Sequence, residues 1–144
     1  MKFSIVIPLY NEEDNIELLI KEINEALDNL ESLFEIILVD DGSEDNTIKI
    51  IKKINSNNLI FVQNSKNYGQ SYSLREGIKH ANNNTIVVLD GDMQNNPQDI
   101  SALIDLYKTG SFQLIGGIRR KRRDNFIKIF SSCISNKIRM FILK

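Results

Sequence analysis

The sequence predicts an α/β domain, in which a mostly parallel sheet is covered by helices on both faces. Short apolar runs alternate along the chain with amphipathic segments of helical spacing, which is the pattern of repeated strand–helix units. The runs are continuously apolar, as in strands buried on both faces of a sheet. With 144 residues, of which 42% are hydrophobic and 26% charged, the chain can build one buried core and lacks the composition of a disordered protein.

The elements can be assigned in order along the chain. The predicted strands are the apolar runs at residues 2–8, 34–40, 59–64, 85–90 and 112–117. The predicted helices are residues 15–30, 45–54 and 71–81, and one that begins near Pro97, where a proline suits the first turn. In the first helix the apolar side chains form one stripe, at positions 16, 19, 20, 23, 27 and 30.

Several function classes are disfavoured by composition alone. Cys133 is the only cysteine, so no internal disulfide is expected and a reducing compartment fits. No run of about 18 apolar residues occurs, so no membrane span is expected. The first apolar run reaches Pro8 and then acidic residues without a small-residue cleavage site, so it predicts a first strand rather than a signal peptide.

Charge divides the chain into a body, residues 1–118, and a basic segment, residues 119–144. The segment holds nine Lys or Arg and one acid, whereas the body holds nine basic and 18 acidic residues. A basic segment favours a membrane surface, a phosphate-bearing substrate or nucleic acid, and a solvated basic helix is the alternative. Its apolar residues recur at helical spacing, which predicts an amphipathic helix on a membrane; packing onto its own domain is the rival interpretation.

Polar clusters follow the first four predicted strands. They read PLYNEE, DDGSEDNT, NYGQ and DGDMQ in chain order. In a parallel sheet the carboxyl ends of the strands open on one edge, where ligands bind. We therefore expect the four clusters to face one pocket.

The cluster after the fourth strand has the chemistry of a metal site. Asp90 and Asp92 alternate across an extended chain, and Gly91 would let the backbone turn and bring their carboxylates together. Two carboxylates and the amide of Gln94 form a hard oxygen site suited to Mg²⁺ or Mn²⁺, completed by water and substrate phosphate. In the alternative, Asp90 caps a turn while Asp92 and Gln94 are solvated.

The first two clusters also allow two interpretations. Asp40 ends a buried strand, where a carboxylate needs hydrogen-bond donors, and a nucleobase or ribose hydroxyl could supply them. A plain turn after it, with Asp45 capping the next helix, is the alternative. In the first cluster Asn11 could cap the following helix, whereas Tyr10 could stack on a base.

The segments VIPLYNEEDNI, ILVDDGSEDNT, NYGQSYSLREGIKHA and VVLDGDMQNNPQDI resemble, in this order, the nucleotide-sugar-binding domain of inverting family-two glycosyltransferases. More narrowly, they resemble the polyprenyl-phosphate branch, which includes dolichyl-phosphate mannosyltransferases and bacterial undecaprenyl-phosphate transferases of the aminoarabinose type. The resemblance implies a GT-A type, Rossmann-like fold, with residues 1–118 as the nucleotide-sugar-binding domain. Polyprenyl-phosphate members usually continue into further interfacial and transmembrane helices, so the chain is expected to be C-terminally truncated relative to them.

The resemblance implies roles for particular residues. The positions that match base- and ribose-binding residues are Pro8, Tyr10, Glu12 and Asp40, and Asp90 joins them in holding the nucleotide sugar. The positions that match the metal and diphosphate segment are Asp90, Asp92 and Gln94. Arg119 and Arg122 match a VRxxRxD pattern whose arginines lie near phosphate, so they join Asp92 as the expected catalytic residues.

The expected function is inverting, metal-dependent transfer of a sugar from a nucleotide sugar, a UDP-sugar rather than a GDP-sugar, to a polyprenyl phosphate. A phosphate acceptor is already anionic, so no general base is needed, and the lone His80 is expected to be structural. The alternatives are a glycan acceptor and a non-catalytic module that binds nucleotide sugar. The protein is expected on the cytoplasmic face of the membrane, without nucleic acid as a partner, and a homo-oligomer stays open because related membrane enzymes are often multimeric.

Overall fold

The structure is a computed structural model and describes residues 1–117. Its strands are β1 (Phe3–Leu9), β2 (Phe34–Asp40), β3 (Leu59–Gln63) and β4 (Ile86–Val88). Its helices are α1 (Ile16–Ala26), the 3-10 helix η1 (Asp28–Leu33), α2 (Thr47–Ile51), α3 (Gln70–Lys79) and α4 (Asp99–Lys108). The four strands and the four α-helices alternate in the predicted order.

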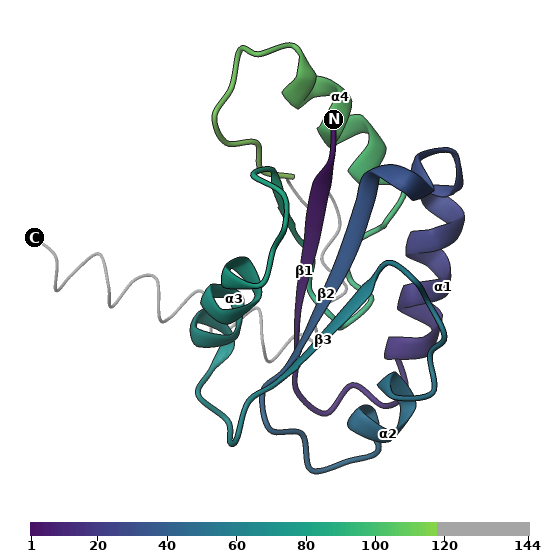
Figure 1. The fold of residues 1–144 in the computed structure, drawn as a ribbon, viewed down its shortest axis with the longest axis vertical. Helices are drawn as coiled ribbons and strands as arrows, with labels where there is room; N and C mark the ends of the chain where they lie inside the picture. The colour runs from purple at the N-terminus through teal and green to yellow at the C-terminus, as the bar shows by residue number, and fades with distance from the viewer. Residues whose placement is uncertain (118–144) are drawn as a thin grey trace, which may run out of the picture.

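The strands form one parallel sheet in the order β3-β2-β1-β4 (Figure 1). β1 pairs with β2 over its whole length, from Phe3 opposite Phe34 to Leu9 opposite Asp40. Every residue of β1 is buried, as the continuous apolar run predicts for a central strand. All the carboxyl ends therefore lie along one edge of the sheet.

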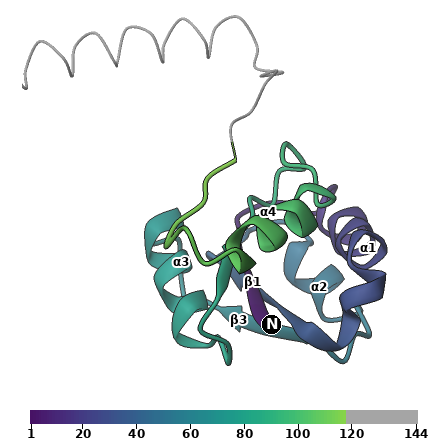
Figure 2. The same ribbon diagram turned by 90° about the horizontal axis from the view of Figure 1, so that it is seen from above.

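Helices cover both faces of the sheet, as predicted (Figure 2). α3 packs on one face, where its Leu74 meets Val6 and Val39 of the two central strands. On the other face α1, α2 and α4 enclose the larger core with the odd-numbered residues of β1. The buried stripe of α1 consists of Ile16, Leu19, Ile20 and Ile23. Each of these side chains contributes about 1.5–3 kcal/mol on burial, which fixes α1 against the sheet.

Two predicted helices are shorter in the structure. α1 stops at Ala26, and the predicted turn to residue 30 continues as η1, in which Leu30 still packs against the core. α2 stops at Ile51, because the N–H groups of Lys53 and Ile54 bond three residues back instead of four. The spacing of apolar residues in the sequence therefore located both helices but did not predict where they end.

The predicted fifth strand, residues 112–117, is wrong. This segment forms no strand, and its Leu114 is 88% exposed. The neighbouring strand β4 has only three residues and pairs with β1, so its outer edge offers little length for another strand. Apolar composition alone therefore did not identify a strand here. The predicted domain boundary at residue 118 and the amphipathic helix of residues 119–144 lie outside the described residues.

Candidate functional site

A cleft of about 430 Å³ lies at the carboxyl ends of the strands, where the sequence places its polar clusters. Loops after all four strands line it, so the four clusters do face one pocket. The lining residues are Pro8, Leu9, Tyr10, Glu12, Asp41, Asn67, Gly69, Gln70, Asp90, Gly91 and Asp92. A larger hollow, about 930 Å³, lies at the opposite edge and is lined mainly by asparagines before β3 and around Glu35. We place the functional site in the smaller cleft, because paired carboxylates and an exposed aromatic ring converge there.

Asp90 is held in place by two side-chain amides. Gln70 Nε2, at the start of α3, donates to Asp90 Oδ1 at 2.9 Å, and Asn95 Nδ2 donates to Asp90 Oδ2 at 3.2 Å. The carboxylate therefore has a fixed orientation at the cleft wall. Neither amide was assigned a role from the sequence, although Gln70 belongs to the NYGQ cluster that was expected to face the pocket.

Asp92 shares the cleft wall with Asp90. Its Oδ1 accepts a hydrogen bond from the backbone N–H of Gln94 at 3.1 Å, and Met93 between them has a left-handed φ of 58°. The chain turns at Gly91 and Asp92, as predicted, and the left-handed residue that follows is Met93. Gly91 is needed for a further reason, since a Cβ there would come within 2.5 Å of Leu9 Cδ2.

These donors fit a divalent metal by their chemistry. Asp90 and Asp92 supply carboxylate oxygens to one cleft, the ligand type that Mg²⁺ and Mn²⁺ prefer. Within residues 1–117, no three His, Cys, Asp or Glu side chains are grouped closely enough to hold a metal on their own. Gln94 is not part of the cleft lining, so the metal site would depend on water and substrate phosphate for its remaining ligands.

Asp40, the predicted nucleotide ligand on β2, is 0% exposed and does not line the cleft. Its Oδ2 accepts hydrogen bonds from the backbone N–H groups of Gly42 and Ser43, both at 3.1 Å, so Asp40 closes a local turn after β2. Its Oδ1 is buried and has no hydrogen-bond partner among the described residues. An unpaired buried carboxylate oxygen is unfavourable, so a ligand N–H or O–H that reached it would relieve that penalty.

Asp41 lines the cleft and organises the loop after β3, a role that sequence reasoning missed. Its Oδ1 accepts from Asn64 Nδ2 at 2.8 Å and from the Tyr68 N–H at 3.0 Å, and its Oδ2 accepts from the Gly69 N–H at 2.7 Å. Burial by itself would raise the pKa of Asp41, but these donors, together with the Ser73 hydroxyl, outweigh burial and lower the pKa. Asp41 therefore remains charged and fixes the loop that carries Gln70.

The loop after β1 brings the remaining predicted residues to the cleft. Pro8, Tyr10 and Glu12 all line it, and the Tyr10 ring is 42% exposed. Glu12 is anchored twice, because its N–H donates to Thr47 Oγ1 at 2.8 Å and its Oε2 accepts from Asn15 Nδ2 at 2.7 Å. An exposed ring beside an oriented carboxylate can stack on a base and accept hydrogen bonds from a nucleoside.

Asn11 does not cap α1, contrary to one interpretation of the sequence. It has a left-handed φ of 55°, its N–H donates to Ser43 Oγ at 2.9 Å, and its Oδ1 accepts from the Glu44 N–H at 2.8 Å. Asn11 therefore ties the loop after β1 to the loop after β2. The helix begins five residues later, at Ile16.

Two further expectations concern residues away from the cleft. His80 follows α3, and its Nδ1 lies 2.8 Å from the carbonyl oxygen of Glu76, consistent with a structural position. The predicted phosphate-binding residues Arg119 and Arg122 lie outside the described residues. No helix within residues 1–117 is long and apolar enough to cross a membrane.

Comparisons with known proteins agree with this arrangement. The sequence profile of the family described as Glycosyl transferase family 2 matches residues 4–141. The undecaprenyl-phosphate 4-deoxy-4-formamido-L-arabinose transferase of Proteus mirabilis is 35% identical over 138 residues, which are 94% of this chain and 42% of that protein. An uncharacterised glycosyltransferase of Synechocystis is 38% identical over 141 residues, 96% of this chain and 44% of that protein. The chain thus spans about two-fifths of the length of these curated relatives.

Solved structures share the fold. The crystal structure of residues 1–349 of S. aureus TarS in complex with UDP-GlcNAc superposes with a TM-score of 0.69 at 25% identity, covering 87% of this chain and 37% of that TarS chain. Glucosyl-3-phosphoglycerate synthase of Mycobacterium tuberculosis, in complex with Mn²⁺, UDP and phosphoglyceric acid, gives a TM-score of 0.61 at 26% identity, covering 76% of this chain and 40% of the synthase. The GT-A type fold predicted for the described residues is therefore confirmed.

Proposed function

The chain belongs to glycosyl transferase family 2, and from this we propose that it transfers a sugar from a nucleoside-diphosphate sugar to a polyprenyl phosphate. The observation that carries the proposal is the pair Asp90 and Asp92 in one cleft with Tyr10 and Glu12. Carboxylates suited to a metal and diphosphate thus lie beside groups suited to a nucleoside. Because the chain spans about two-fifths of its relatives, the activity of the whole protein belongs to this proposal.

For the donor, we propose a UDP-sugar rather than a GDP-sugar. Two structural neighbours at 25% and 26% identity are described in complex with UDP-GlcNAc and with UDP. Tyr10 would stack on the base, with Pro8 beside it, and Glu12 would bind the ribose. Asp40 would accept a hydrogen bond from the nucleoside at its buried Oδ1, which has no donor among the described residues.

Asp90 and Asp92 would hold Mg²⁺ or Mn²⁺ at the diphosphate, and because Gln94 does not line the cleft, water and substrate phosphate would supply the remaining ligands. A divalent ion in this position offsets the negative charge that develops on the leaving nucleotide. The hydrogen bonds of Gln70 and Asn95 keep Asp90 oriented for that purpose. One of the structural neighbours is described in complex with Mn²⁺, which supports a divalent ion for this site.

For the acceptor, we propose a polyprenyl phosphate, since curated relatives carry undecaprenyl phosphate in their names. Its phosphate is already anionic, so attack on the sugar carbon does not depend on a general base, and inversion follows from a single displacement. No histidine lines the cleft. Arg119 and Arg122 would bind phosphate, and the basic segment 119–144 would hold the protein at the cytoplasmic face of the membrane.

The test is transfer of labelled sugar from a panel of UDP- and GDP-sugars by the full chain, in vesicles that contain undecaprenyl phosphate. We expect label in the lipid fraction with a UDP-sugar and Mn²⁺, and none with chelator. If the label appeared in a soluble glycan instead, the acceptor would be a glycan and not a polyprenyl phosphate. Nucleotide binding without any transfer would favour a non-catalytic nucleotide-sugar-binding module.

A further inference from the structure

The loop before α3 and the first turns of α3 carry a continuous stack of cationic and aromatic side chains. The Tyr68 and Tyr72 rings stack with their centroids 4.5 Å apart. Lys66 Nζ lies 5.2 Å from the centroid of the Tyr68 ring, and Arg75 Cζ lies 4.9 Å from the centroid of the Tyr72 ring. We call these four residues, Lys66, Tyr68, Tyr72 and Arg75, the cation–tyrosine ladder. Each contact is at a distance where aromatic and cation–π interactions are favourable.

The ladder lies in a basic part of an otherwise acidic body. The basic residues of α3 and the loop before it are Lys66, Arg75 and Lys79, and the only acid between residues 66 and 79 is Glu76. Glu76 pairs with Lys79 at 2.7 Å and with Arg75 at 3.4 Å, so it neutralises part of this charge. Residues 66–79, which form α3 and the loop before it, therefore carry three positive charges against one negative charge.

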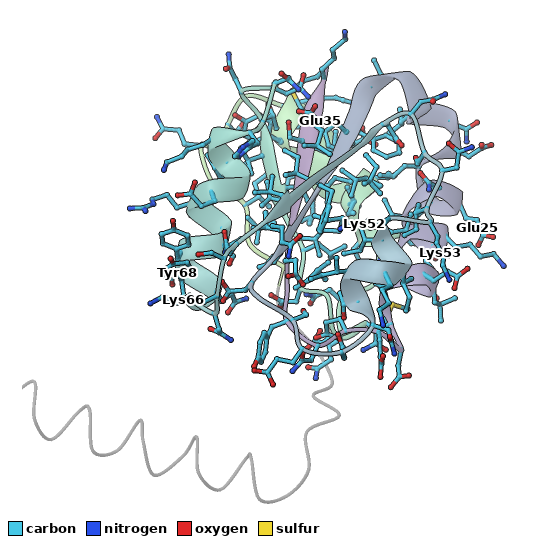
Figure 3. The ribbon with its side chains drawn as sticks, turned by 60° about the horizontal axis from the view of Figure 1, so that its bottom comes forward. Glu25, Glu35, Lys52, Lys53, Lys66 and Tyr68 are labelled. Carbon is cyan, nitrogen blue, oxygen red and sulfur yellow. The ribbon has the colours of Figure 1, made fainter. Side chains whose placement is uncertain are left out.

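The ladder also begins at the rim of the cleft. Tyr68 stands between Asn67 and Gly69, which both line the cleft, and its backbone is held by Asp41. Figure 3 shows Lys66 and Tyr68 side by side at the left of the view, away from Lys53 and Glu25 at the right. The Tyr68 side chain is 46% exposed, so the start of the ladder is accessible beside the cleft.

We propose that the cation–tyrosine ladder contacts an anionic membrane surface and so turns the cleft toward a lipid-borne acceptor. This inference rests on the proposed function for the lipid nature of the acceptor. Tyrosine favours the level of the lipid headgroups, and lysine and arginine are attracted to anionic lipids. Nucleic acid is a poorer partner, because both rings already have a neighbouring ring and a cation against them and are not open for stacking on a base.

The test is sedimentation of the full chain with phosphatidylcholine vesicles, with and without phosphatidylglycerol. For Lys66→Gln/Arg75→Gln we expect roughly tenfold weaker partitioning onto the phosphatidylglycerol vesicles, since each basic residue near an anionic surface contributes to binding. Tyr68→Ala/Tyr72→Ala should weaken partitioning in the same direction. Because residues 119–144 are present in every variant, the comparison measures the ladder alone.

The matched control is Lys21→Gln/Lys108→Gln, which removes the same charge from α1 and α4. We expect its partitioning to stay within about twofold of the wild type. An equal loss in this control, or no loss in the Lys66→Gln/Arg75→Gln variant, would overturn the inference. So would binding of a DNA duplex that is lost in the ladder variant while vesicle binding is unchanged.

Binding of UDP with Mn²⁺, measured on the same proteins, separates this inference from the proposed function. We expect all variants to retain nucleotide binding, because none of the substituted side chains lines the cleft. If the wild type failed to bind nucleotide, the proposed function would fail, yet the vesicle comparison would still decide whether the ladder is a membrane contact.

Discussion

Two adjacent aspartates at the end of β2 have opposite surroundings. Asp41 accepts hydrogen bonds from Asn64, Tyr68 and Gly69 in the loop after β3. Asp40, by contrast, has one oxygen in a local turn and one without a partner among the described residues. The sequence predicted that a carboxylate at this buried strand end would need donors. It could not predict which residues donate, because the donors to Asp41 lie 23 to 28 residues further along the chain.

Replacing Asp41 should loosen the loop that carries Tyr68 and Gln70. Asp41→Ala leaves a buried amide and two backbone N–H groups without their acceptor, so we expect the free energy of unfolding to fall by about 3 kcal/mol. Urea unfolding followed by circular dichroism measures this. Asp105→Ala, an exposed carboxylate paired only at the surface with Lys108, should change stability by less than about 0.5 kcal/mol. Similar losses in both variants would contradict the role of Asp41.

The same carboxylate predicts a pH dependence of stability. The pKa of Asp41 in the folded protein is below its ordinary value of 3.8, because the hydrogen bonds from the loop outweigh the effect of burial. Its contribution is therefore fully present above the unfolded pKa and is lost as pH falls through the folded pKa. In urea titrations at stepped pH, the stability of the wild type should fall below about pH 4, and that of Asp41→Asn should fall less steeply. Parallel curves would contradict this.

Helices and strands whose side chains are buried along the whole element were predicted well. Segments at the margin of the core, and the ends of helices, were predicted poorly. The continuous apolar runs located β1 and β2 to within a residue, and the apolar stripe located α1. Residues 112–117 contain a short apolar run, Leu114 and Ile115 after Phe112, but form no strand, because a strand needs an accessible partner edge as well as apolar side chains. The end of α2 was also missed, since it depends on how the last turn tightens.

α3 approaches the sheet closely enough to require glycine at position 77. A Cβ there would lie 2.4 Å from Val6 Cγ1 and 3.0 Å from Val39 Cγ2, both on stiff β-branched side chains of central strands. Gly77→Ala gains about 1 kcal/mol in helix propensity but overpacks the core. We expect a net loss of about 1–2 kcal/mol in unfolding free energy by thermal denaturation.

Gly116→Ala is the control for this substitution. A Cβ at Gly116 would meet no atom within 4 Å, so we expect a change below about 0.5 kcal/mol. A stabilised Gly77→Ala variant would show that α3 can move away from the sheet without loss, and would contradict the close packing described above.

On the scale of the whole molecule, the sequence predicted the parallel sheet, the coverage of both faces and the meeting of four polar clusters at one edge. These follow from strand polarity, which places every carboxyl end on the same side. The hydrogen bonds that hold the cleft residues were not predictable, because Gln70, Asn95 and Asp41 are oriented by contacts between loops. The cation–tyrosine ladder was not predictable either, because the acidic net charge of residues 1–118 conceals a local group of basic and aromatic side chains.

Hydrogen exchange should reproduce the layered burial of the molecule. Amides of β1 and β2, the two central and almost wholly buried strands, should exchange most slowly, because they open only on global unfolding. Amides of residues 112–117 should exchange early, since this segment forms no strand and is largely exposed. Exchange monitored by mass spectrometry decides this, and strong protection of residues 112–117 would restore the fifth strand.

The most direct test of the proposed donor site is calorimetric titration of the full chain with UDP, in the presence of Mn²⁺ and in the presence of chelator. We expect UDP to bind with Mn²⁺, to bind more tightly than GDP, and to lose at least about tenfold in affinity in chelator and in Asp92→Ala. Asp105→Ala should bind as the wild type does. If UDP bound equally well without metal and in Asp92→Ala, or bound under none of these conditions, the cleft at the carboxyl ends of the strands would not be a metal-dependent nucleotide site.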